Sequence, residues 1–360
     1  MKIGMVAPPL GTASMAVAAS LSRNLARRGH EVHFIGHRSG TPYLAEEGVI
    51  EHVIDPSTSA ATDPPMHDLA LAAKIAAVAS EAQLDLVHVH AAIPHAVAAS
   101  IACRIVTGKK PRLVTTLHGA ELNLIESDLC LLGLARHALD ASDAVTCVSD
   151  SIRRAVIEEL GPRAIVVIPD FLDPMPRTFK AAAPGRPAIL HISNFRPGKR
   201  IDLVMETFRR VNRDIACDLL LVGDGPERAM AREQARQMGL QSAVKFLSGV
   251  ESYEALPEAD VFLLPSDNES FGFAALAAMA AGIPVVGTDA GGLPEVVKHG
   301  ESGYLLPVGD VDGLTERCCE ILRDRERRLE MGEAAQKRAQ SLFGPGRVVA
   351  EFEQLYSSLL

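Results

Sequence analysis

Short apolar runs alternate with longer amphipathic segments along this sequence, and that alternation constrains the fold more than any other feature. Residues 2–7 form a strand-like run, residues 14–28 carry apolar side chains at helical spacing, and residues 31–36 are strand-like again. Gly29 directly follows Arg27 and Arg28, which is typical of a helix end. A strand–helix–strand unit of about 35 residues joins parallel strands, so we predict a parallel sheet.

The same alternation occurs in two halves of the chain. Residues 171–187 contain repeated prolines and a run of alanines, and we interpret them as a linker because they cannot continue a sheet. Before the linker, further strands are expected at residues 86–90, 113–117, 144–148 and 165–168, with a helix at about residues 94–105. After it, strands are expected at residues 188–192, 218–222, 244–246, 261–264 and 285–287, and helices near residues 200–213, 226–239, 271–281, 311–324 and 326–342.

The predicted fold class is therefore α/β, with two doubly wound Rossmann-like domains in series. The predicted domains are residues 1–170 and 188–345, joined by the linker at 171–187. Residues 346–360 are expected to form a helix that packs back toward the N-terminal domain. Ligands of such sheets bind beyond the carboxyl ends of the strands, so we expect the site in the cleft between the two domains.

The charge balance and the aromatic content exclude several kinds of partner. The 360 residues include 36 basic and 45 acidic side chains, a net charge of −9, and aromatic residues make up 4% with no tryptophan. Such a chain lacks both the basic surface and the stacking platform of a nucleic-acid binder, so no nucleic-acid partner is expected. No apolar run reaches 18 residues and the N-terminus does not resemble a signal peptide. We therefore expect no integral membrane segment and a cytoplasmic location.

The cysteine and histidine patterns do not indicate a metal site. The six cysteines form no C-x-x-C pair and mostly lie in apolar stretches, as reduced core residues do. His88 and His90 share one face of an expected strand, where a metal site is conceivable, but no third ligand of suitable spacing follows. We expect no metal ion, and the sequence leaves the oligomeric state, including a homo-oligomer, open.

The segment from residue 260 to residue 295 carries the strongest indication of chemistry. A buried strand runs into a polar turn that contains Glu269 and Ser270, and a nearly all-apolar helix begins near Phe271. Backbone amides of Ser270 and Gly272 at such a helix start can hold a phosphate, and Glu269 can accept hydrogen bonds from sugar hydroxyls. An ordinary buried helix with a polar entry turn remains an equally good interpretation of this segment alone.

Several motifs together resemble a known family. Glu-Ser-Phe-Gly at 269–272, Gly-Ile-Pro-Val-Val-Gly-Thr-Asp-Ala-Gly-Gly-Leu-Pro-Glu-Val-Val at 282–297, and the segments 221–227 and 300–305 resemble the retaining glycosyltransferases of family 4, which have the two-domain GT-B fold. The resemblance covers nearly the whole chain. Within that family, residues 86–95, 114–119 and 191–200 are most similar to the bacillithiol-pathway N-acetylglucosaminyl L-malate synthases.

The resemblance implies a site for a UDP-linked sugar, with no cofactor and no metal. It places the donor diphosphate against Arg196 and Lys199, and the donor sugar beside His118 and Glu269, the first glutamate of an E-x7-E motif. The remaining donor contacts that it implies come from backbone and helix-start positions: Ser270, Phe271, Gly272, Gly249 and Val250.

The sequence departs from the family pattern in three places. Ala277 occupies the position of the second glutamate, which normally takes the ribose hydroxyls. The glycine-rich loop after the first strand is reduced to Gly11, and bulkier residues follow at Thr12 and Ser14. The acceptor pocket also differs from that of the malate-using enzymes, with Ala91, Glu121 and Asn123 at its positions; an acidic Glu121 there would repel malate or favour another acceptor.

The resemblance predicts a retaining hexosyltransferase, with UDP-N-acetylglucosamine as the first donor to test and a small molecule or glycan as acceptor. A second hypothesis is a non-catalytic paralogue that binds a nucleotide or a partner protein, which Ala277 and the 12–15 run favour. A third is a two-domain sugar-nucleotide epimerase or hydrolase, from which the Glu-Ser-Phe-Gly context points away.

Overall fold

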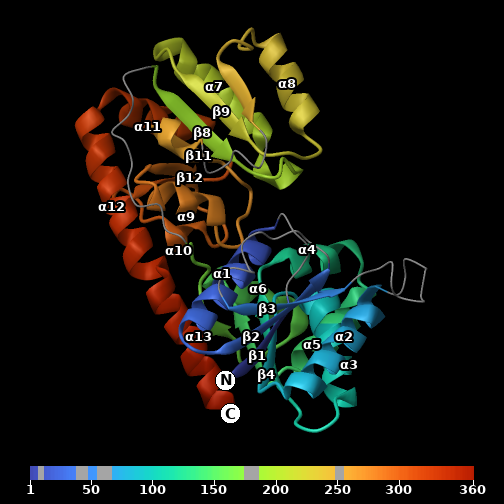
Figure 1. Ribbon diagram of the computed structural model, residues 1–360. Coiled ribbons are helices and arrows are strands. Elements are labelled where there is room, and N and C mark those ends of the chain that lie inside the picture. Colours follow the sequence, from blue (N-terminus) through green and yellow to red (C-terminus); the bar gives the residue numbers. More distant parts are fainter. Residues whose placement is uncertain (7–11, 38–47, 55–66, 174–185, 248–254) are drawn as a thin grey trace. The chain divides into compact units, whose positions relative to one another are not determined.

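The computed structural model describes residues 1–6, 12–37, 48–54, 67–173, 186–247 and 255–360 (Figure 1). The predicted α/β class is confirmed: the described strands form two sheets in which every pair of neighbours is parallel. The chain divides into two compact units. Unit 1 comprises Met1–Asp173 with Pro345–Leu360, and unit 2 comprises Pro174–Gly344.

Unit 1 contains a seven-stranded sheet in the order β3-β2-β1-β4-β5-β6-β7. Its strands are β1 (Lys2–Val6), β2 (Glu31–His37), β3 (Val49–Ile54), β4 (Leu86–Val89), β5 (Arg112–Leu117), β6 (Ala144–Cys147) and β7 (Val166–Val167). Its helices are α1 (Ala13–Arg27), α2 (His67–Ala82), η2 (Ala92–Ala96), α3 (Val97–Ile105), α4 (Ala120–Ser127), α5 (Leu131–Asp140), α6 (Asp150–Leu160) and α13 (Pro345–Leu359). The strand order reverses between β1 and β4, which makes their carboxyl ends the switch point of this sheet.

Unit 2 contains a six-stranded sheet in the order β10-β9-β8-β11-β12-β13. Its strands are β8 (Ala188–Ile192), β9 (Asp218–Val222), β10 (Val244–Leu247), β11 (Val261–Leu264), β12 (Val285–Thr288) and β13 (Gly303–Leu306). Its helices are η3 (Pro197–Lys199), α7 (Ile201–Asp214), α8 (Arg228–Gln237), η5 (Leu256–Glu258), α9 (Phe273–Ala280), α10 (Leu293–Val296), α11 (Val311–Arg323) and α12 (Arg325–Phe343). The order reverses between β8 and β11, so the loops after these two strands flank the switch point.

Local sequence signals account for both ends of α1, the helix that follows β1 in unit 1. Thr12 caps α1, because its hydroxyl accepts a hydrogen bond from the Met15 amide at 3.2 Å. Gly29 follows the end of the helix with a φ of +88°, a conformation that glycine adopts without strain. The final helix, α13, packs beside α1, and Glu353 of α13 lies 2.9 Å from His30 (Figure 1).

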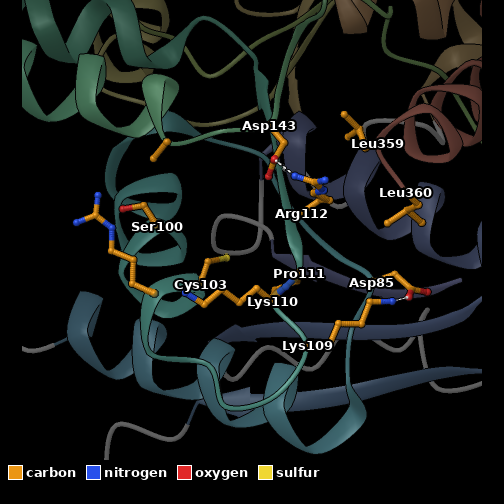
Figure 2. Close-up of a pocket in the computed structure, with 12 residues that line it drawn as sticks. Asp85, Ser100, Cys103, Lys109, Lys110, Pro111, Arg112, Asp143, Leu359 and Leu360 are labelled. Carbon is orange, nitrogen blue, oxygen red and sulfur yellow. Dashed lines mark hydrogen bonds and ion pairs between the residues drawn. The ribbon is translucent and has the colours of Figure 1, made fainter.

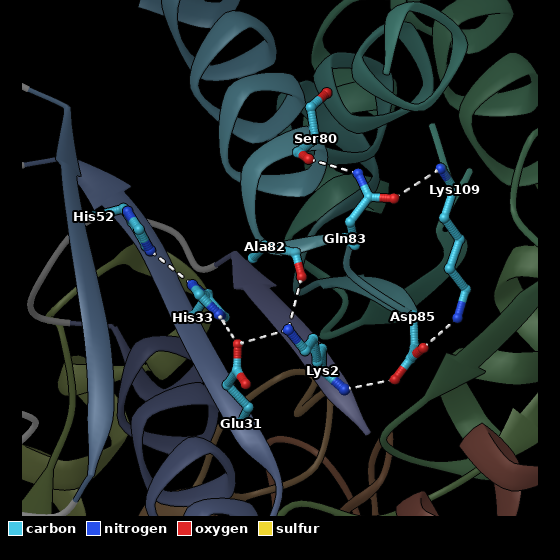
Figure 3. A network of polar contacts seen from close by, with 9 residues as sticks. All are labelled: Lys2, Glu31, His33, His52, Ser80, Ala82, Gln83, Asp85 and Lys109. Atoms are coloured by element: carbon cyan, nitrogen blue, oxygen red, sulfur yellow. Dashed lines mark hydrogen bonds and ion pairs between the residues drawn. The ribbon is translucent and has the colours of Figure 1, made fainter. Parts of the chain in front are cut away.

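The amino ends of the unit 1 strands are tied together by a polar network (Figure 3). The backbone amide of Lys2 donates to Asp85 at 2.6 Å, and Asp85 is also paired with Lys109. The Lys2 ammonium group lies 3.5 Å from Glu31, whose carboxylate lies 3.0 Å from His33. These contacts fix the sheet edge opposite the carboxyl ends of the strands.

The described residues include no disulfide bond and no helix that could span a membrane. None of the six cysteines forms a disulfide bond; four of them are buried, whereas Cys130 is exposed and Cys103 is half-buried. Among the helices of the described ranges, none has the length and apolar character needed to cross a membrane.

Candidate functional site

In unit 2, the loops after β8 and β11 bring Lys199 and Glu269 together. The Lys199 ammonium group donates to Oε1 of Glu269 at 2.7 Å, and the Ser266 hydroxyl donates to the same oxygen at 2.7 Å. Glu269 is buried at 8% exposure, and Oε2 receives no hydrogen bond from the described residues. This oxygen of the oriented carboxylate can accept a hydrogen bond from a ligand hydroxyl.

Two glycines after β12 hold the backbone of Glu269 in place. The Gly292 amide donates to the Glu269 carbonyl at 2.6 Å. A Cβ atom on Gly291 would lie 2.1 Å from the Glu269 carbonyl oxygen, and one on Gly292 would lie 2.4 Å from the Ser270 carbonyl oxygen. The two loops therefore pack backbone against backbone, which explains why the sequence has a Gly-Gly pair here.

A second backbone contact supports the loop that carries Arg196. A Cβ atom on Gly223 would lie 1.8 Å from the Ser193 carbonyl oxygen, and the Glu227 amide donates to the Phe195 carbonyl at 3.0 Å. Phe195 itself is fully buried with a φ of +43°, an uncommon conformation for a bulky residue. The loops after β8 and β9 therefore pack backbone against backbone next to Arg196.

The two predicted cations of this loop differ in their surroundings. The Lys199 side chain is paired with Glu269, whereas the exposed Arg196 side chain forms no hydrogen bond or ion pair with the described residues. The neighbouring Arg200 is paired with Asp202 and Asp267, each at 2.8–2.9 Å between closest atoms. Arg196 is therefore the cation of this loop whose charge is unbalanced within the described residues.

The predicted helix-start residues fall into two groups. Gly272 is the N-cap of α9 with a φ of +97°, and Ser270 is half-buried beside it. The Phe271 ring is 3% exposed and packs edge-to-face on Phe343, so its side chain lies in the core. Ala277 is 2% exposed within α9. Gly249 and Val250, predicted to meet the base, lie outside the described residues.

In unit 1, His118 follows β5 and is held from both sides. Its Nδ1 lies 3.4 Å from Oδ1 of Asp170, and its Nε2 lies 3.1 Å from Nδ1 of His90. Burial lowers the pKa of His118, but the carboxylates of Asp170 and Glu121 outweigh burial and raise it above its ordinary value. The sequence analysis did not predict Asp170 as a partner of His118, although an acidic residue just after β7 was the available signal.

The predicted acceptor residues occupy different environments. Glu121 is 4% exposed, and its two carboxylate oxygens accept hydrogen bonds from the amides of Gly119 at 3.0 Å and Ala92 at 3.3 Å. The acid therefore braces the ends of β4 and β5 rather than presenting a free charge. Ala91 is half-buried and Asn123 is exposed. Thr12 and Ser14 lie at the start of α1 with their hydroxyls 3.1 Å apart, and Gly11 lies outside the described residues.

Unit 1 also has a charged pocket away from the predicted site residues. A pocket of about 660 Å³ opens at the amino ends of β4, β5 and β6, opposite the switch point of unit 1, and contains no predicted site residue (Figure 2). Charged side chains dominate its wall, among them Arg104, Lys109, Lys110 and Arg112. No group of three or more His, Cys, Asp or Glu residues in the described part of the chain is placed to hold a metal ion.

Comparisons with known proteins match both halves of the chain. The Glycosyltransferase Family 4 pattern matches residues 16–175, and the pattern of Glycosyl transferases group 1 matches residues 177–338. The N-acetyl-alpha-D-glucosaminyl L-malate synthase of Bacillus anthracis is 36% identical over all of this chain and 97% of its own length. A GDP-mannose-dependent alpha-(1-6)-phosphatidylinositol monomannoside mannosyltransferase of Mycobacterium tuberculosis is 30% identical over 63% of this chain and 64% of its own.

Solved structures share the fold. Anabaena Alr3699/HepE in complex with UDP-glucose has a TM-score of 0.82 over 99% of this chain and 100% of its own, at 21% identity. The sucrose-phosphate synthase of Thermosynechococcus elongatus has a TM-score of 0.77 over 99% of this chain and 98% of its own, at 20% identity.

Proposed function

The chain belongs to family 4 of the glycosyltransferases, and on that premise we propose that it moves a hexose from a UDP-sugar to a hydroxyl group with retention of configuration. The observation that carries the proposal is the buried Glu269 carboxylate, which Lys199 and Ser266 orient at the switch point of unit 2. N-acetylglucosamine is the hexose to test first, because the full-length relative from B. anthracis is named for it.

The proposed chemistry uses side chains of this chain for charge and orientation. The acceptor oxygen bonds to the anomeric carbon as the bond to the donor diphosphate breaks on the same face, and the acceptor proton passes to a phosphate oxygen. Arg196 and Lys199 balance the charge that develops on the diphosphate, together with the amides at the start of α9. Oε2 of Glu269 accepts a hydrogen bond from a hexose hydroxyl, and this contact orients the anomeric carbon.

His118 has a less direct role in this proposal than the sequence resemblance implies. Both of its ring nitrogens are occupied by groups of unit 1, Asp170 and His90. A sugar hydroxyl would have to displace one of these partners to reach the ring. We therefore assign His118 to the electrostatics of the acceptor side, as an imidazole whose pKa the nearby carboxylates raise.

The acceptor and the nucleotide need separate tests. Calorimetric titration with UDP, with GDP as the control, tests the nucleotide; micromolar UDP binding with no GDP binding is expected. Incubation with UDP-N-acetylglucosamine and a panel of hydroxy acids and glycans, L-malate included, then tests transfer, and NMR of the product tests the α-anomer that retention requires. The route uses no metal or other cofactor, so EDTA should leave the rate unchanged. No binding of either nucleotide would overturn the proposal.

A second candidate function is a non-catalytic member of the family that binds UDP without turnover. Ala277 favours it, because the position that would carry a ribose-binding carboxylate holds a methyl group at 2% exposure. UDP binding together with no product from any acceptor and no donor hydrolysis is the result that this alternative expects. Donor consumed without acceptor would instead favour a hydrolase. For either form, we propose a cytoplasmic location, in which the six cysteine thiols stay reduced.

A further inference from the structure

A chain of buried polar side chains in unit 1 links the last helix to the His118 site. His88, on β4, lies with Nδ1 2.7 Å from the Tyr356 hydroxyl of α13 and with Nε2 2.7 Å from the Thr116 hydroxyl of β5. The Thr116 hydroxyl lies 2.6 Å from that of Thr146. Tyr356 and His88 are fully buried, and Thr116 is 2% exposed.

The contacts of the Tyr356 hydroxyl fix the direction of this chain. Among the described residues, His88 is its sole hydrogen-bonding partner. If His88 donated to the phenol oxygen, the phenol proton would be buried without an acceptor among the described residues, which is unfavourable. Tyr356 therefore donates to Nδ1 of His88. The ring is neutral, carries its proton on Nε2 and donates to Thr116.

His90 lies between His88 and His118 and contacts both rings. His88 and His90 share one face of β4 and their ring centroids are 4.4 Å apart, while the His90 and His118 centroids are 5.4 Å apart. His118 donates from Nδ1 to Asp170, and its Nε2 faces Nδ1 of His90. Nε2 of His90 lies 3.2 Å from the sulfur of Met5, a weak acceptor that pairs best with a ring N–H.

These contacts place one positive charge in a cluster of three imidazoles. With the His90 proton on Nε2, its Nδ1 accepts, and His118 carries protons on both nitrogens. The charged and titratable groups that face His118 are Asp170, Glu121, His90 and His88; those that face His90 are His88, His118 and His95. Burial and the charge of His118 lower the pKa of His88 to about 3, and burial and its histidine neighbours lower the pKa of His90 well below its ordinary value.

We propose that Tyr356 is a positioning residue for the His118 site. Its hydroxyl holds His88 in one tautomer and one orientation, the His90 ring lies against that ring at a tilt of 33°, and Nδ1 of His90 accepts a hydrogen bond from His118. Its consequence for catalysis rests on the proposed function, whereas its consequence for His118 does not. Tyr356 lies 268 positions from His88 in the sequence.

Tyr356→Phe tests this arrangement, since it removes one oxygen atom and keeps the ring. Phe352→Leu is the matched control. Phe352 lies on the same helix, and its ring centroid is 5.4 Å from that of His88, but a phenyl ring has no group that could hydrogen-bond to the imidazole. The first readout is NMR of ¹⁵N-labelled histidine, assigned with His88→Gln and His118→Gln variants. We expect Tyr356→Phe to mix the two His88 tautomers and lower the titration midpoint of His118 by about half a pH unit or more. Phe352→Leu should lower the melting temperature and leave both signals unchanged.

The second readout is transfer activity. In Tyr356→Phe we expect kcat to fall about tenfold with little change in the donor KM, and the pH–rate profile to move with the His118 midpoint. A His88 tautomer and a His118 midpoint equal to those of the wild type would overturn the proposal. If Tyr356→Phe does not fold, Thr116→Val removes the other hydrogen bond of the same ring and should shift the same midpoint. If the wild-type protein transfers no sugar, the proposed function fails while the NMR result still decides the role of Tyr356.

Discussion

The ammonium nitrogen of Lys199 lies 2.7 Å from Oε1 of Glu269, although the two residues are 70 positions apart in the sequence. The loops after β8 and β11 make this contact because the two strands are neighbours in the sheet. The Asp267 amide strengthens the junction by donating to the Gly198 carbonyl at 3.0 Å. The pair therefore depends on strand order as much as on the two side chains.

Lys199→Met should reduce turnover by about 100-fold or more, because it removes a fixed positive charge beside the donor and releases the Glu269 carboxylate. The thioether chain keeps most of the packing. Lys298→Met is the control, since the Lys298–Glu301 pair is exposed and lies outside the site. Initial-rate kinetics on both variants, with melting temperatures measured in parallel, check the prediction. Wild-type turnover in Lys199→Met would remove the pair from the mechanism.

Arg196→Ala should weaken UDP binding without affecting stability. The side chain is exposed and has no partner among the described residues, so its loss should change the free energy of unfolding by less than about 0.5 kcal/mol. Losing a charge-assisted bond to phosphate costs about 1.5–3 kcal/mol, or about 10–100-fold in affinity. Calorimetric titration with UDP measures the effect, with the exposed Arg213→Ala as control; equal affinities for the two variants would contradict the assignment.

Gly291→Ala should destabilise the protein far more than Gly300→Ala. Both glycines have positive φ, +61° and +75°, so each substitution pays about 1–2 kcal/mol for that conformation. A Cβ atom at Gly300 meets nothing within 4 Å, whereas one at Gly291 overlaps the Glu269 carbonyl oxygen at 2.1 Å. We expect Gly291→Ala to cost more than about 3 kcal/mol in urea denaturation and to reduce turnover by moving Glu269. Equal losses in the two variants would show that the loops separate easily.

Ala277→Glu should make stability depend more strongly on UDP. A carboxylate at a position that is 2% exposed lacks a partner in the free protein, so the melting temperature should fall. If the ribose lies at this position, its hydroxyls satisfy the carboxylate, and saturating UDP should raise the melting temperature more than in the wild type. Ala277→Gln provides the uncharged control. The same UDP-induced shift in all three proteins would place the nucleotide elsewhere.

Asp170→Asn should remove a contribution to stability that is confined to acidic and neutral pH. The folded-state pKa of His118 is raised above the unfolded value of about 6.5, mainly because Asp170 outweighs burial. The stability from this shift is fully present below pH ~6.5 and is lost as the pH rises through the folded value. Urea denaturation should therefore show a larger wild-type advantage at pH ~5.5 than at pH ~8.5. An advantage that grows with pH would mean that His118 is neutral in the folded protein.

The sequence pattern missed the edge strands β3 and β13 and several helices of unit 1, among them α2, α5 and α6. The pattern predicted the central strands because each is a buried apolar run, and β4, β8 and β11 are examples. It did not predict β3, because the buried and exposed residues of this strand do not alternate regularly. β3 pairs with β2 alone. Phe271, predicted as a backbone contact of the donor, has its ring in the core, where it packs edge-to-face on Phe343 of α12.

The sequence by itself determined the α/β class, because hydrophobic periodicity locates the strands. The family resemblance predicted that Lys199 and Glu269 share one site, and both follow strands whose carboxyl ends lie at one edge of a parallel sheet. Only the tertiary structure decided which side chains pair over long separations: Asp170 with His118, Tyr356 with His88, and the Glu121 carboxylate with the Ala92 and Gly119 amides. These partners carry no local pattern. Their contacts follow from strand order and helix packing, which bring distant segments within hydrogen-bonding distance.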